Sequence, residues 1–367
     1  MKDVALSIRH AGILKFFPPP RFLEMPAVGL DISDESLRCL YFGKHQGSVS
    51  LDFYKESPLP QGTIAEGYVN NPKEVTDVLR AMSKDFPTKF VRAALPDEKA
   101  FLFKVQIPRV PQAAIRQSVE SVLEENVPIS AADAVFDCAL IHSSRESEDH
   151  LDIGVAVLPS KVVSTYEEII KAADLEPVSF TVKAQAIANS VIPRDEKRPY
   201  LIVNFEARKT GLYIASGGIV HFASTLDIGG NAITSAIEKH FSVSTLEAER
   251  IKQEKGFIKD RKNMDLFFSL VNTVSALKDE ISKLTIYWYT HKDKYGNIGE
   301  KIHKIILCGR DAGLAGFDEY LALTMKSSVE VANPWRNVFD FDTYIPPLQF
   351  LESLNYAAAA GCVLPEI

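Results

Sequence analysis

The first hundred residues alternate short apolar stretches with polar turns, in an order that predicts three strands, a helix and a fourth strand. Apolar residues dominate 28–32, 36–43 and 48–56, and each of these stretches has the length of a strand. Apolar residues recur at helical spacing within 72–84, and a last apolar stretch at 91–95 ends at a proline. This part of the chain therefore reads β-β-β-α-β.

The same order returns in the second half of the chain. Strands are predicted at 201–205, 211–215, 219–223 and 304–308, and a helix follows the glycine pair at 229–230. Further helices are predicted at 244–255, 263–284, 314–325 and 356–363. The chain thus contains an internal repeat, and duplicated α/β halves bind ligands in the cleft between them.

Residues 101–177 have a different pattern, which predicts a small α+β insert. Two strands flank a charged loop at 143–149, which is expected to be exposed. The other predicted elements are strands at 101–107, 134–142 and 151–158 and helices from Pro111 and over 161–173.

Composition limits the function classes. The chain has 367 residues, enough for two or more domains, and 48 acidic against 41 basic residues give it a formal charge of −7. Nucleic-acid binding needs clustered Lys and Arg, so a nucleic-acid partner is not expected. A small phosphate ligand needs only a few local donors and remains compatible with this charge.

The cysteines and the N-terminal residues indicate no catalytic chemistry, but they bear on the cellular compartment of the chain. The four cysteines lie far apart and have no metal-ligand spacing, which indicates reduced, mostly buried thiols in the cytoplasm (Cys39, Cys138, Cys308 and Cys362). No apolar stretch is long enough for a transmembrane helix. Residues 1–25 lack the pattern of a signal peptide, and we expect an N-terminal arm that contacts a membrane or partner, folds onto its own domain, or stays disordered.

Candidate chemistry is confined to four loops at equivalent points of the repeat. The chain has no GxxxxGK[ST], GxGxxG, HExxH or GxSxG motif, and its eight histidines show no ligand spacing. The loops run over Asp31–Arg38, Asn204–Thr210, Ile228–Asn231 and Leu307–Gly313, each following a predicted strand.

These loops, in this order, resemble the nucleotide-binding loops of the actin-like ATPase superfamily. Within it the chain resembles the PilM family of type IV pilus assembly proteins, relatives of the cell-division protein FtsA, over about residues 26–364. The segments that carry the resemblance are Val28–Ile32, Gly62–Asn70, Leu226–Thr234, Glu247–Lys252, Lys304–Gly309, Val331–Pro334 and Ala357–Gly361.

The resemblance implies an actin-like, ribonuclease H-like α/β fold with two β-β-β-α-β domains and a small insert. The first domain would comprise 26–100, 177–199 and 345–367, and the insert 101–176. The second domain would span 200–344, with a helical subdomain at about 240–290.

The resemblance also implies an ATP site with Mg²⁺. Asp31 would position the magnesium ion and a water molecule, and glycines would let the backbone approach the nucleotide. The implied nucleotide-binding residues are Asp31, Ser33, Ser36, Arg38, Thr210, Gly229, Gly230, Asn231, Glu249, Lys252, Gly309 and Arg310. Simpler roles stay open: Asp31 as a turn cap, the glycines as turns, and Glu249 with Lys252 as an ion pair on a helix.

Several residues depart from the family pattern and argue for weak or absent hydrolysis. Ser33 replaces a glycine, Arg38 replaces a lysine, and Glu206 stands in a loop where Asp-x-Gly is usual. Asp34 and Glu35 place carboxylates where phosphates would lie, and two like charges at about 4 Å cost roughly 4 kcal/mol at an effective dielectric of 20.

The resemblance implies a cytoplasmic assembly platform that a PilN-like inner-membrane protein recruits to the membrane through its cytoplasmic tail. The tail would dock near residues 62–70 and the insert, and other pilus assembly subunits would join the complex. The alternatives are a nucleotide-free scaffold, an FtsA-like division protein and a small-molecule kinase of the same superfamily. An FtsA-like division protein would need a terminal amphipathic helix, and a kinase would need a segment that reads as a sugar pocket. Neither feature is found in this sequence.

Overall fold

The computed structural model of the chain describes residues 25–45, 48–141, 150–261, 263–292, 296 and 298–364. The expected N-terminal arm, apart from Met25, and the charged loop at 143–149 lie outside these residues.

A five-stranded sheet with the order β10-β6-β1-β2-β3 forms the first half. Strands β1, β2 and β3 pair antiparallel, whereas β6 pairs parallel with both β1 and β10. Its strands are β1 (Val28–Ile32), β2 (Ser36–His45), β3 (Ser48–Pro58), β6 (Phe90–Leu95) and β10 (Glu176–Val182).

The second half repeats this topology in a sheet with the order β13-β12-β11-β14-β15. Again the first three strands pair antiparallel and the next two join in parallel, so β11 corresponds to β1 and β14 to β6. The strands are β11 (Tyr200–Phe205), β12 (Thr210–Ser216), β13 (Ile219–Leu226), β14 (Lys304–Cys308) and β15 (Val329–Val331). The internal repeat expected from the hydrophobic pattern is therefore present in the strand order.

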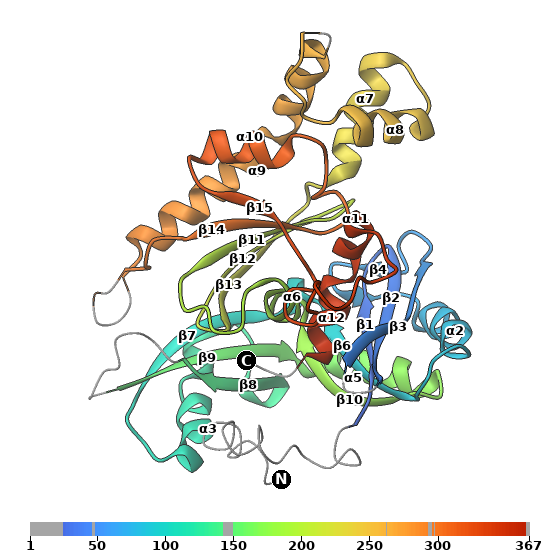
Figure 1. Cartoon of the computed structure of the whole chain (residues 1–367). Helices are drawn as coiled ribbons and strands as arrows, with labels where there is room; N and C mark the ends of the chain where they lie inside the picture. Colours follow the sequence, from blue (N-terminus) through green and yellow to red (C-terminus); the bar gives the residue numbers. More distant parts are fainter. Residues whose placement is uncertain are drawn as a thin grey trace.

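Helices accompany both sheets (Figure 1). In α2 the side chain of Asn71 accepts a hydrogen bond from the backbone N–H of Glu74, which satisfies a free donor at the helix start. The helices of the first half are α2 (Pro72–Ser83), α5 (Ser160–Ala172), α6 (Lys183–Val191), α11 (Phe350–Ser353) and α12 (Ala357–Val363). Those of the second half are α7 (Gly230–Phe241), α8 (Thr245–Lys255), α9 (Met264–Thr290) and α10 (Phe317–Met325).

The insert is a three-stranded antiparallel sheet in the order β7-β9-β8, which in Figure 1 lies below the second sheet and to the left of the first. It has its own apolar core, which includes Ile107, Val119 and Ile153. Helix α5, which follows β9, instead contributes Tyr166 and Ile170 to the large core shared by the two halves. The elements of the insert are β7 (Phe101–Pro108), α3 (Gln112–Glu120), α4 (Leu123–Asn126), β8 (Ala134–Leu140) and β9 (His150–Pro159).

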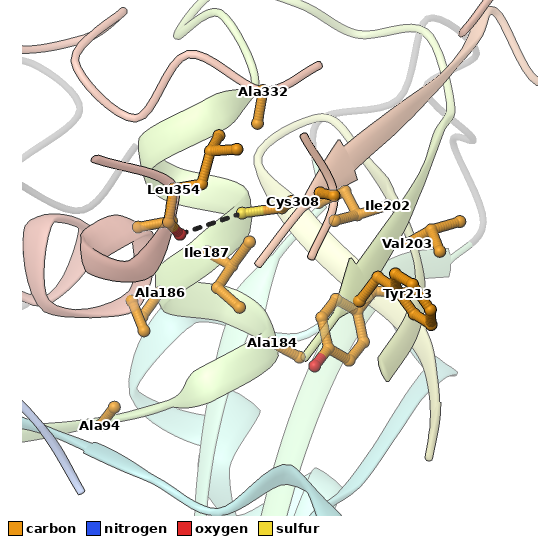
Figure 2. Close-up of a cluster of buried hydrophobic side chains, with 14 of the residues drawn as sticks. Ala94, Ala184, Ala186, Ile187, Ile202, Val203, Tyr213, Cys308, Ala332 and Leu354 are labelled. Carbon is orange, nitrogen blue, oxygen red and sulfur yellow. Dashed lines mark hydrogen bonds between the residues drawn. The ribbon is translucent and has the colours of Figure 1, made fainter. Parts of the chain in front are cut away.

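Helix α6 lies in the middle of this large core. Figure 2 shows Ala184, Ala186 and Ile187 of α6 near Ile202 of β11 and Cys308 of β14, all of them buried. Helix α12 packs closely on α6. The two helices are so near that a Cβ added at Gly361 would lie only 1.6 Å from the carbonyl oxygen of Ala186. Since side chains of both halves bury α6, its first residue, Lys183, has a fixed position between them.

Two expectations about the chain as a whole can be compared with this structure. All four cysteines are free; Cys39, Cys308 and Cys362 are buried and Cys138 is partly exposed. Among the described residues, no helix has both the length and the hydropathy needed to cross a membrane.

The contact between α6 and α12 gives a first prediction. Gly361→Ala should lower the free energy of unfolding by about 1–3 kcal/mol, because the added methyl group has no space against the backbone of Ala186. The loss should appear even though alanine favours a helix over glycine by about 1 kcal/mol. Thermal denaturation measures it, with Ala113→Val on the exposed side of α3 as the control. An unchanged melting temperature for Gly361→Ala would contradict the tight contact.

Candidate functional site

The first loop begins with a buried ion pair. Asp31, next to last in β1, lies directly opposite Arg38 on β2, and both side chains are 1% exposed. A guanidinium nitrogen of Arg38 lies 3.7 Å from Asp31, and its Nε donates a hydrogen bond of 3.0 Å to Glu56. The turn between the strands is closed locally, because the Ser33 hydroxyl donates to the carbonyl oxygen of Ser36. The Ser36 hydroxyl donates to Glu56.

Lys183 enters this group from the start of α6. Its ammonium group lies 3.3 Å from Asp31 and 3.8 Å from Glu206, and its side chain is 12% exposed. Burial opposes the charged form of Lys183, but Asp31 and Glu206 raise its pKa above the usual value, so the side chain stays protonated. No sequence motif pointed to this lysine.

The second loop supplies Glu206, the partner of both cations. Arg38 lies 3.7 Å from Glu206. Burial disfavours the charged carboxylate, but Arg38 and Lys183 hold its pKa below the usual value. Nearby, Arg208 pairs with Glu35 of the first loop at 3.3 Å, so a second ion pair joins the two loops. The Thr210 hydroxyl donates to the carbonyl oxygen of Ile228.

The glycines of the third loop lie against the second loop. The backbone N–H groups of Gly230 and Asn231 donate to the carbonyl oxygens of Glu206 and Ala207. An added Cβ at Gly229 would lie 2.6 Å from each of these oxygens. The glycines thus permit a close approach to the backbone of the second loop. The backbone N–H groups of Gly230 and Asn231, at the start of α7, are already engaged in hydrogen bonds to that loop.

The fourth loop carries a second buried ion group. Gly309 has a φ of +92°, which favours glycine, and its turn leads to Asp311, which is 1% exposed. Lys252 is also 1% exposed and lies 3.0 Å from Asp311 and 2.9 Å from Glu249. The helix-face ion pair of Glu249 and Lys252 is therefore present, and Asp311 extends it. Arg310 is exposed at this end of the cleft.

Two adjoining cavities follow these loops. The first, of about 580 Å³ and open to solvent, lies between the first loop, the β6 end and the second loop. The second, of about 450 Å³, lies over Asn231, Glu249, Lys252 and Arg310, so the structure brings these predicted residues together. Asp31 and Arg38 lie behind the first cavity, and Ser33 lines it.

A further acidic cluster lines the first cavity, and no sequence motif indicated it. Tyr213 on β12 donates a hydrogen bond to Asp97, and Lys209 lies 3.3 Å from Glu98. Asp97 and Glu98 lie in a short helical turn after β6, so both contacts join the two halves. Burial, together with the neighbouring Glu98, raises the pKa of Asp97 to about 7.

These residues do not fit a magnesium ion. Mg²⁺ needs free carboxylate oxygens in octahedral geometry, whereas the carboxylate of Asp31 already faces the cations of Arg38 and Lys183. Nor do the described residues contain a group of three or more His, Cys, Asp or Glu side chains placed to hold a metal. The metal-positioning role that the resemblance implied for Asp31 is not supported by this surrounding charge.

A triphosphate fits the charge of the cleft poorly as well. Seven carboxylate residues and five cationic ones line the two cavities. Burial, with Glu206 and Asp34, raises the pKa of Glu35, which indicates how crowded the negative charge is. The second cavity is lined by three cationic and three carboxylate side chains, whereas carboxylates outnumber cations in the first, so the second is the less unfavourable place for a nucleotide.

The Asp97 contact predicts a pH effect on stability. The folded pKa of about 7 lies above the ordinary value of 3.8, so protonation of Asp97 stabilises the folded state. That contribution is complete below about pH 4 and is lost as the pH rises to about 7. Compared with Asp97→Asn, the natural chain should therefore lose free energy of unfolding between pH 4 and 7. Denaturant titrations at each pH measure this, with Asp77→Asn as the exposed control. Parallel pH profiles for both chains would contradict it.

Comparisons with known proteins identify the family and the fold of the chain. The family model described as Type IV pilus assembly protein PilM matches residues 29–365. Among solved structures, the PilM-PilN type IV pilus biogenesis complex matches with a TM-score of 0.73 and 21% identity, covering 92% of this chain and 98% of that chain.

Two further structures are similar in fold. MreB5 of Spiroplasma citri bound to ADP has a TM-score of 0.53 and 13% identity, with 85% of this chain and 93% of that chain covered. EutJ from Carboxydothermus hydrogenoformans has a TM-score of 0.52 and 11% identity, with 93% and 89% covered. The predicted actin-like fold is confirmed. Because the family model covers nearly the whole chain, the chain belongs to the PilM family of type IV pilus assembly proteins.

Proposed function

We propose that the chain is a cytoplasmic assembly platform of a type IV pilus or related secretion machine. Its membership of the PilM family supports this assignment, and so does the likeness of its whole fold to the PilM of a PilM-PilN complex. A platform needs a rigid body with a surface for partners, and the buried core shared by the two halves provides such a body.

We further propose that the cleft is a weak ATP site with no appreciable hydrolysis. The observation that carries this proposal is the ammonium group of Lys183, 3.3 Å from Asp31. A carboxylate paired in this way is not available to hold a metal ion or to orient an attacking water. ATP binding itself is supported by the second cavity, whose lining carries as many cations as carboxylates, and by the ADP-bound MreB5 of the same fold.

The partner that we propose is the cytoplasmic tail of a PilN-like inner-membrane protein, which would recruit the chain to the inner face of the membrane. The surface that we favour lies around β4 (Ile64–Ala65) and β5 (Tyr68–Val69), a small hairpin beside the start of the insert. Tyr68 is 47% exposed there, and the ammonium group of Lys99 lies 4.2 Å from its ring centre. An exposed aromatic ring beside a cation suits a peptide with apolar and acidic side chains.

The nucleotide proposal predicts a small thermal shift and no turnover. Millimolar ATP should stabilise the chain by less than about 2.7 kcal/mol, the gain expected at a hundredfold excess over the dissociation constant. Phosphate release should equal that of a protein-free control, with or without Mg²⁺. Arg310→Ala should reduce the thermal shift, because it removes an exposed cation beside the second cavity. Steady phosphate release that is lost in Asp31→Asn would contradict the proposal.

The partner proposal predicts direct binding of a labelled peptide with the sequence of the PilN-like tail. Fluorescence anisotropy should detect binding, and Tyr68→Ala should weaken it about tenfold or more, the usual effect of removing an anchoring aromatic side chain. Tyr287→Ala is the matched control, because Tyr287 is similarly exposed but lies on α9 in the second half. Equal loss of binding in both variants, or no binding at all, would overturn this surface as the docking site.

A further inference from the structure

We propose that Lys183 is a fixed internal cation that takes the place of a divalent metal ion and joins the two halves of the chain. Its ammonium group lies between Asp31, at the end of the first sheet, and Glu206, in the loop after β11 of the second sheet. This inference does not depend on nucleotide or partner binding, because it concerns only the charge between the halves.

The burial of Asp31 makes such a cation necessary. The side chain of Asp31 is 1% exposed, and neither of its oxygens has a hydrogen-bond partner. A buried carboxylate without hydrogen bonds is stable only beside positive charge. Arg38 supplies part of this charge at 3.7 Å, but its Nε is engaged with Glu56. The nearer cation is Lys183, at 3.3 Å.

The cations already present leave no place for a metal ion. Arg38 and Lys183 each lie within 4 Å of both Asp31 and Glu206, and Arg38 also pairs with the partly exposed Glu56. A divalent ion added here would meet two cations that are held in place. Mg²⁺ also coordinates its ligands at about 2.1 Å and keeps several water molecules. To admit such an ion beside Asp31, the ammonium group of Lys183 would have to move away.

The fold prevents Lys183 from leaving. Lys183 is the first residue of α6, and the next residues of that helix are packed between the two sheets and α12 (Figure 2). The lysine side chain is therefore held on a buried helix and lines the first cavity from there. A metal ion can dissociate and let a cleft open, whereas this cation is covalently part of the chain.

The direct test measures Mn²⁺ binding to the purified full chain by electron paramagnetic resonance, with no nucleotide present. The natural chain should bind Mn²⁺ at this site at least tenfold more weakly than Lys183→Gln, because in the variant two carboxylates lose a cation. Lys171→Gln, on the exposed side of α5, is the matched control and should not change. One tightly bound Mn²⁺ in the natural chain, with unchanged affinity in Lys183→Gln, would overturn the proposal.

A second measurement addresses the joining of the halves and works even if metal binding stays weak. Lys183→Met should lower the melting temperature by several degrees more than Lys171→Met, since it leaves the buried Asp31 and the partly buried Glu206 with fewer cations. The double variant Lys183→Met with Glu206→Gln should lose less melting temperature than the sum of the losses of the two single variants, because both members of the ion pair are then removed together. Equal melting temperatures of Lys183→Met and Lys171→Met, or strictly additive losses, would show that Lys183 does not join the halves.

Discussion

Asp31 and Glu206, which come from different halves of the chain, both meet Arg38 and Lys183 in the middle of the molecule, and the surrounding structure depends on this group of charges. Asp31 and Arg38 come from neighbouring strands, Glu206 from the opposite sheet, and Lys183 from the helix between them. Removing one member leaves an uncompensated buried charge, which costs several kcal/mol, whereas the complete group can be close to neutral for stability. The group thus specifies how the halves sit together more than it strengthens the fold.

The strands could be predicted because each half begins with three apolar stretches of strand length separated by polar turns. Such stretches form strands in the folded chain as the pattern indicates. The elements at 176–191 were not predicted. Strand β10 contains Pro177 and an irregular register beside it, as is usual at a sheet edge. Helix α6 is buried along most of its length and so lacks the polar face by which helices are recognised.

The site was predictable to a similar degree, and for related reasons. The four loops follow strands and contain turn residues, and the family resemblance then predicted that Asp31, Gly229 and Gly309 belong to one site. Lys183 and Asp97 could not be found in this way, because they reach the cleft from segments with no motif. One signal was present: Lys183 is the sole charged residue between Glu176 and Arg194. A single charge in an apolar segment of this kind calls for a buried partner.

The position of helix α12 has a consequence for how the protein forms in the cell. Its residues, 357–363, pack on β1 and α6, and Gly29 of β1 has space for only a hydrogen beside Ala359. Strand β1 therefore receives its covering helix only after more than three hundred further residues have been made. The second sheet, whose strands all lie between residues 200 and 331, has no such delay. Synthesis from the N-terminus would thus complete the second half first, and the earlier half would close on it last.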